Sequence, residues 1–139
     1  MAALAAAGMN IGNLVQRFAE YAPNECKVGG PPDDPTVSLP FVSFSMSDVR
    51  TERFPGSRAR ILAGIQYSIQ ALVAEHNLCA DMQINSVGQG HFECYVSLSF
   101  KTNRGTVFGN VYGDPAIAWL STYVTFLEQQ SKWQHRRKR

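Results

Sequence analysis

The chain has 139 residues, of which 45% are apolar and 17% are charged, and its formal net charge is +2. This length supports one compact core and is short for two. Its longest apolar run falls far short of a bilayer span, which argues against a membrane-spanning protein. The cysteines number three and lack the spacing of a disulfide framework, which favours an intracellular protein, cytoplasmic and also nuclear if the basic end is an import signal.

The first 40 residues predict a helix and a linker. Residues 9–21 place Leu14 and Phe18 on one apolar stripe at helical spacing. Residues 23–40 are rich in glycine and proline, which neither continue a helix nor fit inside a sheet. We therefore expect residues 1–40 to form a short helix followed by a Pro/Gly-rich linker.

Residues 41–133 predict a single α+β domain. Val42, Phe44 and Met46 alternate with serines, which indicates one edge strand after the linker. An antiparallel three-stranded sheet with two helices on one face would bury the apolar stripes that follow. The first predicted element is a helix that is capped by Ser57 and ends near His76 and Asn77. Three strands follow at residues 82–85, 91–100 and 106–112, and a closing helix runs from Asp114 to residue 133.

The closing helix has two apolar stripes, and two stripes need two surfaces to pack on. One stripe is aliphatic and faces the core: Ile117, Leu120, Val124 and Leu127. The other is aromatic: Trp119, Tyr123 and Phe126. We expect the aromatic stripe to contact a second copy of the chain or a protein partner.

The C-terminal end is strongly basic. Lys132 to Arg139 hold five of the 13 basic residues and no acid, and we expect residues 134–139 to form a basic tail. Such a block stays solvated and attracts polyanions. A nuclear-import signal and a solubilising end are open alternatives to phosphate contact. The expected phosphate contacts are Lys132, Arg136, Arg137, Lys138 and Arg139.

Two His-x-x-Cys pairs could supply the four ligands of a tetrahedral zinc site: His76 with Cys79, and His91 with Cys94. Residues three apart on a strand point to opposite faces, and Cys94 belongs to the apolar alternation of its strand. A core cysteine is therefore the preferred interpretation, with no metal and no other cofactor. Motifs for nucleophilic or phosphate-cradling sites are lacking, and we expect no enzymatic activity.

The order of elements from residue 57 to 133 resembles that of the double-stranded-RNA-binding domain family. Gly88, His91 and Tyr95 stand at the spacing of that family's Gly-x-x-His and its following aromatic, and Gly109 and Gly113 precede the closing helix much as they do there. The resemblance implies duplex RNA as the ligand. The expected RNA contacts therefore also include His91, together with the basic residues Lys101 and Arg104.

The chain departs from the family where the closing helix begins. The family has a phosphate-binding lysine cluster there, whereas this chain has Asp114-Pro115-Ala116-Ile117-Ala118. Family domains without the cluster look like dimerisation or docking modules. We therefore expect a small non-enzymatic protein that binds RNA with low sequence selectivity through its basic tail and that is a homodimer or docks on a protein.

The size and charge would suit a viral protein that shields duplex RNA or packages a genome. We expect no association with a membrane. The alternative is a protein interaction or assembly module, such as an adaptor or a structural subunit, without direct RNA binding.

Overall fold

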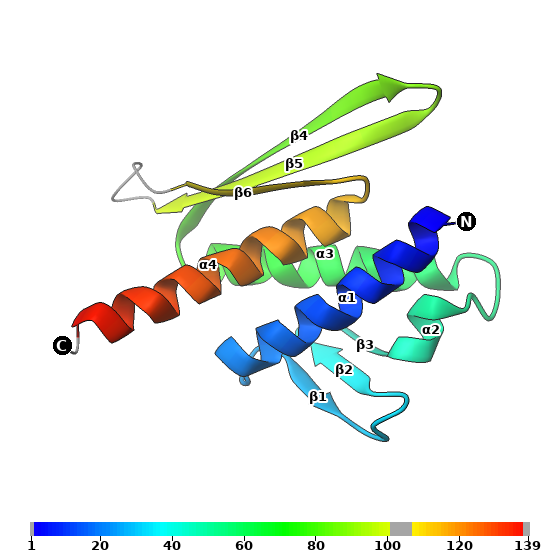
Figure 1. The fold of residues 1–139 in the computed structure, drawn as a ribbon, viewed down its shortest axis with the longest axis horizontal. Helices are drawn as coiled ribbons and strands as arrows, with labels where there is room; N and C mark the ends of the chain where they lie inside the picture. The colour runs from blue at the N-terminus through cyan, green and yellow to red at the C-terminus, as the bar shows by residue number, and fades with distance from the viewer. Residues whose placement is uncertain (1, 101–106, 138–139) are drawn as a thin grey trace. The chain divides into compact units, whose positions relative to one another are not determined.

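The computed structural model describes residues 2–100 and 107–137, and it is an α+β structure, as predicted (Figure 1). The chain divides into two compact units, residues 1–68 and residues 69–139. This division differs from the expected single domain at 41–133. The elements in order are α1 (Ala2–Tyr21), β1 (Lys27–Gly29), β2 (Thr36–Leu39), β3 (Val42–Ser45), α2 (Met46–Arg50), α3 (Ser57–Glu75), β4 (Leu78–Gly88), β5 (His91–Phe100), β6 (Val107–Tyr112) and α4 (Pro115–Arg137).

The first unit joins α1 to a small sheet. The sheet is antiparallel with the order β1-β2-β3, and α1 contacts both β1 and α2. The predicted stripe of α1 is confirmed as buried, with Phe18 fully enclosed. Alanines favour helix, and α1 begins at Ala2, well before the predicted start at residue 9. The other buried apolar side chains of this unit include Val37, Phe44, Met46 and Val49.

The prediction of an irregular linker at residues 23–40 is wrong. Two strands, β1 and β2, lie within it and pair antiparallel. The prolines stay outside these strands. Pro31, Pro32 and Pro35 lie in the connection, where Gly30 takes a φ of +80°, while Pro23 precedes β1 and Pro40 follows β2. A hairpin can therefore form because the prolines lie in its turn or outside its two strands.

Asp34 fastens this connection to the short helix α2. The backbone N–H of Ser47 donates to Asp34 Oδ1 and the Ser47 hydroxyl donates to Oδ2, each at 2.9 Å. The first of these satisfies a backbone donor that a helix start leaves without a partner. Both bonds favour the ionised carboxylate and hold the pKa of Asp34 below its usual value, the backbone bond contributing most.

Helix α3 confirms the predicted helix from Ser57, but Ser57 does not cap it. The Arg60 N–H donates to the Gly56 carbonyl, and the buried Ser57 hydroxyl has no hydrogen-bond partner among the described residues. Helix α3 runs from the first unit into the second, so its placement on the later sheet stays a prediction. Near its middle, Gly64 packs closely on Val42 of β3.

The second unit contains a meander of order β4-β5-β6, with each pair antiparallel. Leu78 lies opposite Phe100 at one end, and Gly88 lies opposite His91 at the hairpin turn. Strand β4 is much longer than the predicted strand at 82–85, whereas β5 has its predicted bounds. Helix α4 packs against β5 and β6 (Figure 1).

Two helical glycines offer a matched test of this packing. A Cβ at Gly12 would lie 3.5 Å from Met46 Cε, an ordinary contact, so Gly12→Ala should raise the free energy of unfolding by about 0.5–1 kcal/mol. A Cβ at Gly64 would lie 2.6 Å from Val42 Cβ, so Gly64→Ala should lower it by roughly 1 kcal/mol or more despite the same gain in helix propensity. Urea unfolding measures both, and shifts of the same sign would contradict the packing.

The Asp34 contact predicts an acid-sensitive contribution to stability. Because the folded state lowers the pKa of Asp34, the contribution is complete above the unfolded pKa of about 3.9 and disappears as pH falls through the folded value. Asp34→Ala should therefore lower the melting temperature at neutral pH and have little effect at the acid end. A melting curve series against pH checks this, and an equal effect of the substitution at every pH would contradict it.

Candidate functional site

The start of α4 has the cap predicted from the sequence, and it offers no basic side chain. Asp114 Oδ1 accepts hydrogen bonds from the backbone N–H groups of Ala116, at 2.8 Å, and Ile117, at 3.4 Å. Pro115 opens the helix, where its missing N–H costs nothing. Ala116, Ile117 and the following Ala118 are buried. This end of the helix is therefore occupied by the Asp114 cap and by packed apolar side chains.

The middle of α4 is fixed to the sheet by polar and aromatic contacts. The Asn110 side-chain amide of β6 donates to the hydroxyls of Ser121, at 3.0 Å, and Thr125, at 3.1 Å. The Thr122 hydroxyl lies 3.1 Å from the carbonyl oxygen of Val96 in β5. These bonds satisfy polar groups on a largely buried helix face.

The aromatic stripe of α4 does not form an exposed face, which corrects the expectation of a docking surface there. Trp119, Tyr123 and Phe126 are all buried, with exposed fractions of 6%, 0% and 1%. The Phe126 ring lies 5.6 Å from that of Phe108 and 5.7 Å from that of Phe100, in edge-to-face geometry. The aromatic stripe therefore helps to build the core, and its side chains are not available to a partner.

The basic end continues α4 as helix. The helix reaches Arg137, beyond the expected end at residue 133, and its last turns extend past the ends of β5 and β6 (Figure 1). Cations at a helix C-terminus are favoured by the helix dipole, which offsets their mutual repulsion. Lys132 is exposed, and so is Trp133, with 62% of its surface open. The end of α4 thus exposes a basic side chain, Lys132, and an aromatic ring, Trp133, to solvent.

The remaining predicted RNA contacts fall in different places. Arg136 and Arg137 belong to the last turn of α4. Lys101, Arg104, Lys138 and Arg139 lie outside the described residues. His91 is exposed beside the β4–β5 turn, at the opposite end of β5 from Phe100, about 30 Å away. His91 is therefore far from the sheet end at which Phe126 of α4 lies beside Phe100.

The four candidate zinc ligands do not converge. Cys79 lies opposite Ser99, and Cys94 lies opposite Ile84, so the two thiols are five positions apart along the ladder and on opposite faces. Burial raises the pKa of the Cys94 thiol, and the charge of Asp114 raises it further, as suits a core cysteine. Among the described residues no three His, Cys, Asp or Glu side chains gather as metal ligands would.

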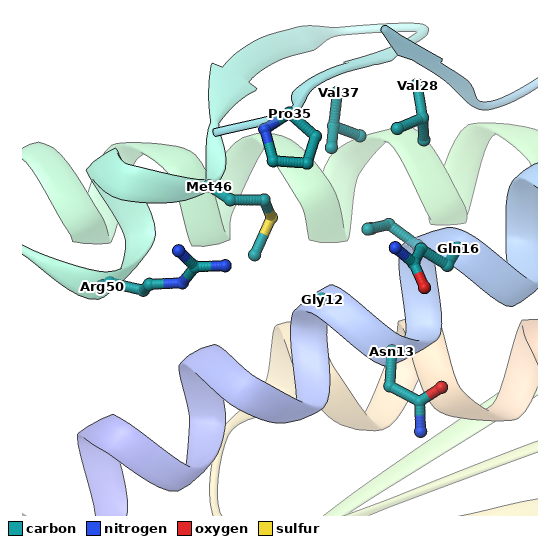
Figure 2. A pocket seen from close by; sticks show the side chains of 9 residues that line it. Gly12, Asn13, Gln16, Val28, Pro35, Val37, Met46 and Arg50 are labelled. Atoms are coloured by element: carbon teal, nitrogen blue, oxygen red, sulfur yellow. The ribbon is translucent and has the colours of Figure 1, made fainter. Parts of the chain in front are cut away.

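A second feature is a hollow of about 370 Å³ in the first unit, between α1 and the β1–β2 hairpin. Figure 2 shows the Arg50 guanidinium and the Gln16 amide on opposite sides of it, with Met46 extending between them. The volume is at the small end for ligand pockets. The lining residues are Gly12, Asn13, Val15, Gln16, Val28, Pro35, Val37, Met46 and Arg50, and they include no acid, thiol or imidazole for catalysis.

A third feature, which the sequence did not predict, is an exposed apolar strip on the β4–β5 hairpin. Met82, Ile84 and Phe92 are 38%, 54% and 55% exposed. The alternation of Met82 and Ile84 with polar residues was a visible signal, but it indicates only that one face is apolar. Whether another element covers that face depends on the tertiary arrangement.

None of the helices in the described part of the chain is long and apolar enough to cross a membrane.

No protein-family model, curated protein or solved structure matches the chain. The resemblance to double-stranded-RNA-binding domains therefore rests on the residues quoted for it and stays a prediction.

The cap of α4 gives a direct test of how this helix begins. Asp114→Ala should lower the free energy of unfolding by about 1 kcal/mol, because two backbone donors lose their acceptor. Asp114→Asn keeps an acceptor oxygen and should cost much less. Chemical unfolding of both variants checks this, and an equal loss from both would mean that the charge, not the cap, supplies the stability.

Proposed function

We propose that the chain is a small non-enzymatic RNA-binding protein that contacts phosphates mainly through the C-terminal end of α4. One observation supports this most: α4 continues to Arg137 and exposes Lys132 and Trp133 beyond the sheet. Bases at positions 132 and 136 are one helical turn apart, a spacing of about 6 Å along the axis. The ammonium group of Lys132 could contact a backbone phosphate while the neighbouring Trp133 indole stacks on a nucleobase.

Duplex RNA is the partner we propose, by analogy with the resembled family and its order of elements. The phosphate contacts that the family makes with a lysine cluster cannot form at the start of α4, because Asp114 caps the helix there and the next residues are buried. Binding would then come from charge at the other end, and it would have low sequence selectivity because phosphates contain no sequence information. An intracellular location, cytoplasmic with access to the nucleus, belongs to the same proposal.

The second candidate is a protein assembly module without direct RNA binding. The exposed apolar strip of Met82, Ile84 and Phe92 favours it, because contiguous apolar surface commonly marks a protein interface. The two candidates differ in which surface matters and in how binding responds to salt.

The test uses fluorescence anisotropy with a labelled RNA duplex of roughly 20 base pairs, which exceeds the ~16 that a domain of the resembled family spans. Arg136→Gln/Arg137→Gln should weaken binding and reduce the slope of log affinity against log salt by about two, measured between about 50 and about 200 mM salt. The matched control is Lys27→Gln/Arg60→Gln, which removes the same charge from two exposed positions in the first unit.

The control should leave the slope unchanged. Equal losses from both pairs would mean that only net charge matters, and absence of binding by the unmodified chain at low salt would contradict the proposal outright. Single-stranded RNA and duplex DNA of the same length determine whether duplex RNA is preferred.

A further inference from the structure

Strand β4 forms an open edge of the second sheet. It spans 11 residues and, within the described part of the chain, pairs only with β5. Strand β6 pairs with residues 94–99 of β5, so the hairpin on the turn side of residue 94 also lacks a third strand. Figure 1 shows this hairpin extending past β6. An open edge presents unpaired backbone N–H and C=O groups that can bind another strand.

The exposed apolar strip lies on the same face of the sheet as the core. Met82 lies opposite Val96 and Ile84 lies opposite Cys94, and both partners on β5 are buried. Because α4 packs on β5 and β6, that face is covered there, while Met82 and Ile84 on β4 stay open.

The edge lacks the usual protection against pairing. Natural edge strands commonly include lysine, proline or several charges that prevent association. The stretch from Leu78 to Gly88 contains neither lysine nor proline, and Asp81 is its only charged residue. The bulge between Ser86 and Gly88 disturbs the ladder only near the turn.

We propose that β4 pairs antiparallel with β4 of a second copy of this chain, about a two-fold axis at Gln83. This register places Met82 of each copy opposite Ile84 of the other, so the two exposed apolar pairs merge on one face. Two three-stranded sheets then become one six-stranded sheet, and the interface is the same patch on both copies.

The side chains of β4, polar and apolar together, favour this register. Centred on Gln83, the pairing sets each Asp81 opposite Asn85 of the other copy, and an amide can donate to a carboxylate there. A two-fold axis at Asp81 would set the two Asp81 carboxylates opposite each other. A two-fold axis at Ile84 would set Met82 opposite Ser86 and Asp81 opposite Val87. Centring on Met82 would also match acid with amide, Asp81 with Gln83, but it would set Ile84 opposite the small Ala80. The Gln83 register is preferred because it sets the two large exposed apolar side chains, Met82 and Ile84, opposite each other.

An exchange of two residues tests the register. Asn85→Asp puts a second carboxylate opposite Asp81 of the other copy, twice in each dimer, so the dimer dissociation constant should rise roughly tenfold or more. Asp81→Asn/Asn85→Asp restores an acid–amide pair with the original composition, and its dissociation constant should return to near that of the unmodified chain. Both variants place the new carboxylate at position 85 opposite Glu93 of the same chain, so this repulsion within the chain is common to both.

Sedimentation equilibrium of the full chain from about 1 to about 300 μM measures the mass. Ile84→Lys should give a monomer, and Phe54→Lys, a change at a similarly exposed ring (56%) in the first unit, should not. A monomer for the unmodified chain throughout this range would overturn the proposal. A dimer that Asn85→Asp leaves unaltered, or that the double exchange weakens as much as Asn85→Asp does, would also overturn it, because the contact between positions 81 and 85 would then be absent.

Discussion

The packing of α4 on β5 and β6 is the constraint on which the second unit depends. The Phe100, Phe108 and Phe126 rings fill the space between helix and sheet, and Asn110 and Thr122 fix the helix position with hydrogen bonds. Both apolar stripes of α4 are used in the core, so the helix has no spare aromatic face to offer a partner. The surfaces to which we assign a function are therefore the C-terminal end of this helix and the part of the sheet that it does not cover.

Two open surfaces among the described residues of the second unit differ in character. The end of α4 is basic and extends past the strands, and the edge of β4 is apolar with a single charge. Our proposals assign phosphate contact to the first and self-association to the second. In such a dimer the basic helix ends would be doubled, and linking two weak phosphate sites raises affinity for a long polyanion without any new contact.

The sequence predicted the α+β class, the order of elements from residue 57 and the bounds of β5, because alternation and helical spacing are strong there. Prediction from the sequence failed where tertiary contacts determine the structure. The Pro/Gly segment forms a hairpin because its prolines all lie outside the two strands. The stripe at Trp119, Tyr123 and Phe126 is buried, and periodicity alone cannot tell whether an apolar face meets the core or a partner. Likewise, the alternation at Met82 and Ile84 did not reveal that α4 packs on β5 and β6 and leaves this face open.

Amide hydrogen exchange at low and high protein concentration tests the central claim most directly, which is that α4 covers β5 and β6 and leaves β4 free to pair. Peptides that span residues 80–87 should exchange more slowly as concentration rises, because the outward backbone groups of β4 gain partners. Peptides from β6, at the other edge, should not change. Exchange in β4 that is independent of concentration, or new protection confined to β6, would contradict the account.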